Sequence, residues 1–261
     1  MIPGHARKSA AALLLVGTLV GTAPLVDRSG FTFVRGALAS APNEDASGIE
    51  AVTSDEGVAA KLLAIRSELA VARTLLRRGA PERAAPHLLA PLEELWSPIH
   101  ETLESRDEAV ETRLEERLAE AAGAEGRAEM DRAATAAMTA VEDALSALFP
   151  RTLRDSSGFR LALVRILLDD AVRAYASGVA MGRLVDTTAY ERAYGLAGTA
   201  EELLRPLAES SSEREVAAAL QELMSELRTA LPSLEPPAAP LPAGRFQALV
   251  SRIELRMGGL V

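Results

Sequence analysis

The chain has 261 residues with 28 basic and 37 acidic side chains, a net charge of −9, and only 3% aromatic residues. This length can enclose a full hydrophobic core, and one domain of about 200 residues is expected. Few aromatic side chains disfavour a β-sandwich and favour closely packed helices built from Ala, Leu and Val. The absence of cysteine excludes disulfides, thiolate metal sites and cysteine nucleophiles.

Residues 1–39 have the features of a targeting segment. His5, Arg7 and Lys8 precede an apolar run from 10 to 26, and Ala37–Ala39 is a small-x-small cleavage site. We therefore predict a signal peptide and a periplasmic or secreted protein. The alternative is an uncleaved N-terminal anchor in the inner membrane, since a mainly apolar run of 17 residues is at the short limit for a bilayer span.

The charge of the remaining chain limits its partners. Residues 1–39 hold four basic and one acidic residue, which leaves 24 basic and 36 acidic residues, net −12. This balance argues against nucleic acid and against an anionic membrane surface. Membrane contact is expected only through an uncleaved N-terminal segment.

After a small, polar spacer at 40–54, expected to be disordered, apolar residues recur at helical spacing. The first helix is predicted at about 55–78 and the second at about 81–104, where Pro86, Pro91 and Pro98 favour kinks or an end and restart near Pro98. Further helices are predicted at 106–122, 126–149, 159–177, 188–207 and 213–230.

The pair 159–207 is the centre of the predicted fold. Gly178 and Gly182 form the turn between its two helices, and Thr188 with Glu191 matches a capping box. Small residues in the apolar stripe of the second helix favour a tight antiparallel interface.

We predict an all-α protein, an antiparallel up-and-down bundle of about eight helices after the N-terminal segment. The bundle domain is expected at 55–230. A Pro-rich linker at 231–244 and a C-terminal amphipathic helix at 245–261, with Phe246 and Ile253 on its apolar face, are expected to follow.

The second helix contains the candidate metal ligands. His87, Glu94 and Glu101 share one stripe at i, i+7 and i+14, and imidazole with carboxylates can bind a divalent metal such as Fe, Zn or Cu. Because 14 helical residues span about 21 Å, a site would use His87 and Glu94 with ligands from another helix, and Glu101 only as a further candidate. The alternative is a polar flank beside the apolar face.

Catalytic signatures are lacking. The sequence has no Gly-x-Ser-x-Gly, no Gly-rich phosphate loop and no His-Glu-x-x-His. We expect a protein that is not an enzyme. Trp96, Tyr175, Tyr190 and Tyr194 are expected to pack in the core.

Residues 175–193 (YASGVAMGRLVDTTAYERA) resemble a pattern in the exported helical region of bacterial iron-permease-family proteins. Tyr175, Gly182, Val185, Asp186 and Tyr190 match that pattern, whereas Ala189 replaces a Glu and Arg192 stands where an acid is common. Residues 87–96 (HLLAPLEELW) are similar to a His-x-x-His-Pro-x-x-Glu-x-aromatic pattern of such proteins, with Ala90 in place of the second His. The permease's membrane helices and Arg-Glu-x-x-Glu motifs are absent from this sequence.

The resemblance implies a soluble periplasmic helical domain linked to metal uptake, in which the scaffold is kept and ligands are lost. We predict a non-enzymatic exported protein, an iron-uptake-associated domain that binds a metal or a protein of the uptake system. The alternative is a structural or protein-interaction module of the cell envelope with no metal, in which residues 232–261 act as a docking arm.

Overall fold

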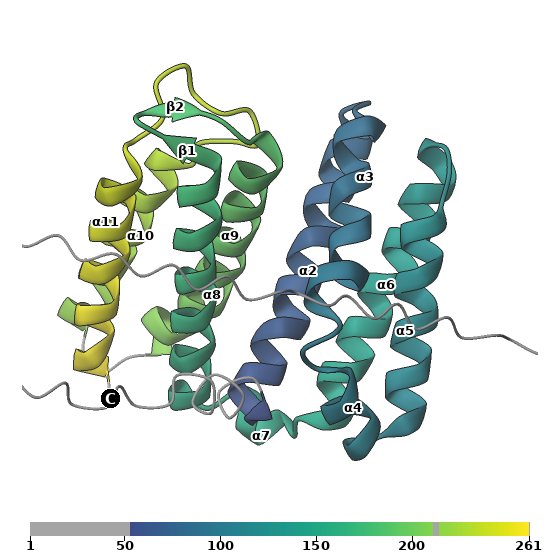
Figure 1. The fold of residues 1–261 in the computed structure, drawn as a ribbon. Coiled ribbons are helices and arrows are strands. Elements are labelled where there is room, and N and C mark those ends of the chain that lie inside the picture. Colours follow the sequence, from purple (N-terminus) through teal and green to yellow (C-terminus); the bar gives the residue numbers. More distant parts are fainter. Residues whose placement is uncertain (1–52, 211–213, 261) are drawn as a thin grey trace, which may run out of the picture. The chain divides into compact units, whose positions relative to one another are not determined.

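The computed structural model describes residues 53–210 and 214–260 (Figure 1). The predicted signal or anchor segment and most of the spacer lie outside these residues. The α-helices are α2 (Asp55–Arg77), α3 (Pro81–Ala90), α4 (His100–Arg106), α5 (Glu108–Gly123), α6 (Arg127–Leu148), α7 (Arg151–Arg154), α8 (Ser157–Gly178), α9 (Thr187–Ser210), α10 (Arg214–Ala230) and α11 (Ala243–Met257). The predicted all-α fold is confirmed.

The helices form two four-helix bundles rather than one series. In the first bundle, α2 packs against α3 and α6, and α5 closes the ring between α6 and the α3–α4 segment. In the second, α8 packs against α9 and α11, and α10 lies between α9 and α11. The short α7 connects the bundles in sequence.

Helix α2 contacts both bundles, because it packs against α8 and α9 as well as α3 and α6. Its predicted apolar stripe explains this position. Val58, Leu62, Ile65 and Leu69 have no exposed surface. Figure 1 shows α2 between the second bundle and the rest of the first bundle. The buried apolar residues of both bundles form one core.

The C-terminal helix belongs to the second bundle, which corrects the predicted division into a bundle at 55–230 and a separate helix at 245–261. Phe246 and Ile253 of α11 are fully buried, and the Phe246 ring stacks on Tyr175 with 4.1 Å between centroids. The predicted linker at 231–244 connects α10 to α11 and is fixed to the bundle, since the Tyr175 hydroxyl donates to the Leu241 carbonyl at 2.8 Å.

The proline-rich second helix is interrupted. It consists of α3, a π-helix η1 (Pro91–Leu95) and, after a turn, α4. The end and restart expected near Pro98 are confirmed. Pro86 lies inside α3.

A β-hairpin joins α8 to α9, although no strand was predicted. β1 (Val179–Ala180) pairs antiparallel with β2 (Arg183–Leu184), and Met181 and Gly182 form the two-residue turn with φ values of 51° and 70°. Two consecutive positive φ values are characteristic of a type I′ turn. The short 3-10 helix η2 (Gly258–Leu260) follows α11.

None of the helices in the described ranges has the length and apolar character needed to cross a bilayer.

Candidate functional site

A buried ion network lies where α2 and α3 of the first bundle meet α9 of the second. We define it by seven charged residues from five segments of the chain. They are Glu68 of α2, Arg83 and His87 of α3, Glu94 of η1, Glu191 and Arg192 of α9, and Glu235 between α10 and α11.

His87 is the centre of this network. Its side chain has no exposed surface, and its two ring nitrogens contact carboxylates on opposite sides. Nδ1 is 2.5 Å from Oε2 of Glu68, and Nε2 is 2.9 Å from Oε2 of Glu191. The imidazole therefore bridges a carboxylate of the first bundle to one of the second.

Each of these carboxylates also binds an arginine. Arg192 Nε donates to Oε1 of Glu68 at 2.7 Å, and Arg83 Nε donates to Oε1 of Glu191 at 2.9 Å. Because all four oxygens of the two carboxylates are used, the buried acids are fully hydrogen bonded, as burial at about 1–2% exposure requires.

Two partly exposed acids end the network. Glu94 accepts from Nη1 of Arg192 at 2.7 Å, and Glu235 accepts from Nη1 of Arg83 at 2.7 Å. Arg83 also donates to the Leu234 carbonyl at 3.3 Å, which ties the connection after α10 to α3.

The network holds His87 in its charged form. Burial by itself lowers the pKa of the imidazole, but the hydrogen bonds to Glu191 and Glu68 and their negative charges outweigh it and raise the pKa to about 9. A protonated His87 donates from both nitrogens. Its charge, with Arg83 and Arg192, compensates Glu68 and Glu191 in the interior.

This arrangement does not fit a single metal ion. Glu68 and Glu191 lie at opposite nitrogens of the His87 ring, so the three side chains cannot face one ion without rearrangement. Across the described ranges, no group of three or more His, Cys, Asp or Glu side chains has a metal-binding arrangement.

The predicted pair His87 and Glu94 is connected only indirectly. Glu94 is half exposed and binds Arg192, which in turn binds Glu68, the partner of His87. Glu101 lies exposed on α4, after the break in the helix. The prediction of a metal at these residues stays a prediction.

Sequence reasoning missed Glu68, Arg83, Glu191 and Arg192. Glu191 was interpreted as part of a capping box with Thr188, but the cap of α9 is Asp186, whose carboxylate accepts from the Ala189 amide at 3.1 Å. The position of Glu191 in the sequence indicates that it is buried, because it lies one residue after Tyr190 and two before Ala193, which are both buried.

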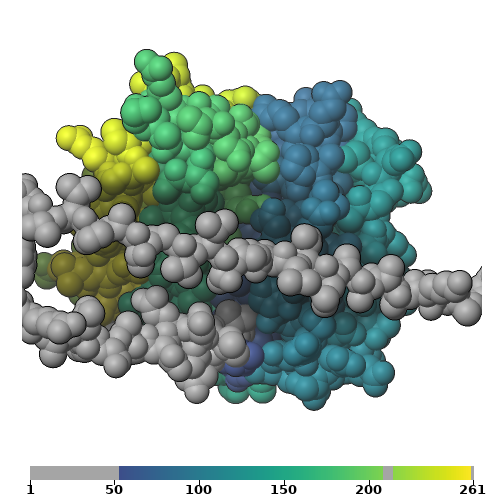
Figure 2. Space-filling model, in the orientation of Figure 1, coloured from purple at the N-terminus to yellow at the C-terminus, as the bar shows by residue number. Residues whose placement is uncertain are grey.

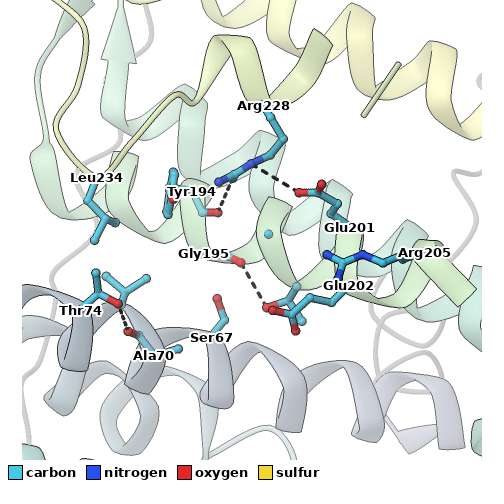
Figure 3. A pocket seen from close by; sticks show the side chains of 13 residues that line it. Ser67, Ala70, Thr74, Tyr194, Gly195, Glu201, Glu202, Arg205, Arg228 and Leu234 are labelled. Atoms are coloured by element: carbon cyan, nitrogen blue, oxygen red, sulfur yellow. Dashed lines mark hydrogen bonds and ion pairs between the residues drawn. The ribbon is translucent and has the colours of Figure 1, made fainter. Parts of the chain in front are cut away.

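A pocket of about 270 Å³ lies beside the network, between α2 and α9 (Figure 3). At Gly195, on the lining of this pocket, α9 approaches α2 closely, because a Cβ there would lie 2.5 Å from Ser67 Oγ and 2.8 Å from Val71 Cγ2. Ser67 is only 4% exposed, and its hydroxyl has no partner within the part of the chain that the structure describes. Arg228 lies over the Tyr194 ring at 4.2 Å and closes one side. The pocket suits water or a small polar solute.

The tyrosine motif at 175–193 has a structural role around the hairpin. Tyr175 and Tyr190 are fully buried as predicted, with ring centroids 6.1 Å apart. Gly178 allows the start of α9 to pass closely, since a Cβ there would lie 2.8 Å from the Tyr190 nitrogen. With Gly182 in the turn and Asp186 at the cap, the motif residues shape the hairpin and fix it to the bundle.

Trp96 is buried, as predicted, and its ring stacks on His100 with 6.5 Å between centroids.

Residues 150–260 match the family described as the iron permease-associated 4-helix bundle domain. The matched residues begin just before α7 and contain α8 to α11, so the match covers the second bundle. It includes the motif at 175–193 and confirms the resemblance to the iron-permease family in this part of the chain. The similar stretch at 87–96 lies outside it. No curated protein and no solved structure matches the chain.

Proposed function

We propose that this protein is a non-enzymatic, exported helical component associated with an iron-uptake system, and that it acts by contacting a protein of that system. The match of the second bundle to the iron permease-associated domain supports the association with iron uptake. The surface of that bundle supports a protein contact.

The observation that carries the proposal is the hairpin between α8 and α9, with Met181 in its turn and Val185 directly after β2. Met181 is 98% exposed and Val185 is 61% exposed, whereas most large apolar side chains of the described residues are buried. The hairpin forms part of a projection at one end of the second bundle (Figures 1 and 2). Apolar side chains exposed on such a projection are accessible to a partner protein.

Met181 is also in an unfavourable backbone conformation. Its φ of 51° is in the left-handed region, where side chains other than Gly, Asn and Asp cost about 1 kcal/mol. The preferred residue before Gly182 in a type I′ turn is Asn. A methionine here worsens the turn and adds nothing to the core, which favours a role outside the folded chain.

The experiment is co-purification of the tagged protein with the iron permease of its native host from detergent-solubilised membranes. We expect capture by the wild type and loss of capture by Met181→Asn, which removes the apolar tip while giving the turn its preferred sequence. Leu255→Asn is the matched control, because Leu255 is 83% exposed on α11. Equal capture by both variants would refute the role of the hairpin, and no capture by the wild type would refute the partner.

The ion network supports contact with a protein over binding of a metal. To bind a metal, His87 must first lose its proton. With a pKa of about 9, this lowers the apparent affinity about a hundredfold at pH 7. The ion would also have to displace Glu68 or Glu191 from the ring.

Thermal melting with Fe, Zn and Cu tests this choice, because a ligand that binds only the folded state raises the melting temperature. We expect no metal-specific rise. A rise that is lost in both His87→Ala and Glu94→Ala would replace the proposal with a metal site at these residues.

A further inference from the structure

A second cavity, separate from the ion network and from the hairpin, lies between the two bundles. It has a volume of about 300 Å³ and is bounded by α2, α6, α8 and α9 together with Arg154 at the end of α7 and the adjacent Asp155. We refer to its large apolar lining residues as the apolar wall, and they are Leu63, Leu145, Phe159, Leu163 and Leu203.

Three arginines, Arg66, Arg154 and Arg160, also line this cavity, in a chain whose net charge is negative. Arg66 binds Glu202 at 2.8 Å and Glu142 at 3.4 Å through its terminal nitrogens. Its Nε is buried and has no hydrogen-bond partner among the described residues. A buried donor without an acceptor costs free energy, and both carboxylates near Arg66 are already bound to its terminal nitrogens.

Arg154 has spare hydrogen-bonding capacity. Its Nε donates to the Phe149 carbonyl at 3.0 Å, and its terminal nitrogens have no carboxylate partner within residues 53–210 and 214–260. The nearby Asp155 is already bound by Arg160 at 2.5 Å and Arg151 at 3.2 Å.

The carboxylates at the cavity are therefore all paired, and one guanidinium is left over. Glu142 and Glu202 share Arg66, and Asp155 has two arginines of its own. A guanidinium without a carboxylate, next to an apolar wall, is complementary to a ligand with one negative charge and an apolar body.

We propose that this cavity binds a small amphiphilic carboxylate, with the carboxylate on Arg154 and an apolar group of about six to ten carbon atoms against the leucine and phenylalanine wall. The volume is at the lower end of the range of about 300–1,000 Å³ for ligand sites, which limits the ligand to a small molecule or one residue. A ligand of higher charge is disfavoured, because Glu142, Asp155 and Glu202 line the same cavity.

The test is isothermal titration of the full-length protein with octanoate, and with octanol, acetate and inorganic phosphate as controls. We expect octanoate to bind, octanol and acetate to bind at least about tenfold more weakly, and phosphate not to bind. N-acetyl-leucine tests the other source of this chemistry, the C-terminal residue of a peptide. Tighter binding of N-acetyl-leucine than of octanoate would identify a peptide end.

Arg154→Gln is expected to weaken octanoate binding about tenfold or more, since it removes a charge-assisted hydrogen bond. Arg117→Gln, on α5 of the first bundle, is the matched control and is expected to bind as the wild type does. Arg154→Lys keeps the charge without the planar fork and is expected to bind at an intermediate level. If Arg154→Gln does not fold, Arg154→Lys tests the role of Arg154, and it should bind octanoate more weakly than the wild type does.

Three results would overturn the proposal. They are no binding of octanoate, equal binding of octanol and octanoate, and binding that is unchanged in the folded Arg154 variants.

Discussion

Replacing His87 with glutamine tests whether a charged imidazole holds the two bundles together. In the wild type the ring donates to Glu68 on one side and Glu191 on the other. A glutamine amide is neutral and cannot reproduce two donors that point in opposite directions. His87→Gln should therefore leave two buried carboxylates with only their arginine partners.

The magnitude follows from the pKa of His87, which is raised from 6.5 to about 9 in the folded protein. At 1.36 kcal/mol for each pKa unit, the folded environment stabilises the charged ring by about 3 kcal/mol. This is at the lower end of the 3–5 kcal/mol lost when one partner of a buried ion pair is removed.

The sign of the pH dependence is fixed by the direction of that shift. Because the folded pKa is above the unfolded one, the contribution is fully present below about pH 6.5 and is lost as the pH rises through about 9. Wild type and His87→Gln should therefore differ by about 3 kcal/mol at pH 6, or roughly 6–12 °C in melting temperature. The difference should become much smaller at pH 10.

The assay is chemical and thermal unfolding of both proteins at pH 6 and pH 10. Any other group that titrates in this range is common to both proteins and cancels in the difference. His100→Gln, which changes a histidine outside the network, should unfold as the wild type does at both pH values. A difference between wild type and His87→Gln that is the same at pH 6 and pH 10 would show that the imidazole is not charged in the folded state.

Five further substitutions test the second bundle, each by thermal unfolding. Tyr175→Phe should destabilise the protein by about 1 kcal/mol, since it loses the hydrogen bond to the Leu241 carbonyl. Tyr190→Phe should be neutral or stabilising, because the buried Tyr190 hydroxyl has no partner among the described residues. A larger loss for Tyr190→Phe than for Tyr175→Phe would contradict this. Gly178→Ala should destabilise the protein by about 1–3 kcal/mol, because the added Cβ would meet backbone atoms of α9. Gly198→Ala, where no atom lies closer than 3.9 Å to the added Cβ, should be neutral or stabilise by up to about 1 kcal/mol. Equal effects of the two substitutions would argue against the close approach at Gly178. Met181→Asn should raise stability by about 0.5–1 kcal/mol, and a loss of stability would show that the methionine packs on the fold.

Helix positions could be predicted from the sequence because they depend on local spacing. The stripe of Val58, Leu62, Ile65 and Leu69 identifies both a helix and its buried face. The hairpin could not be predicted in the same way. Gly178 and Gly182 indicate a turn, but strands of two residues leave no alternation to detect.

The ion network could not be predicted because its contacts are distant in sequence. His87 meets Glu68 across 19 residues and Glu191 across 104 residues. Pairing within one helix, which is all that spacing can show, suggested Glu94 as the neighbour of His87. The true neighbours depend on how α9 packs against α2 and α3, and this packing is decided by small residues such as Gly195.

The position of α2 has a consequence for how the protein unfolds. A helix that supplies core side chains to two bundles cannot leave one of them without exposing the apolar surface of the other. The two bundles should therefore behave as one cooperative unit, with the amides of α2 among the slowest to exchange with deuterium. The chain would then lose both bundles in a single transition, although only one of them matches the family by sequence.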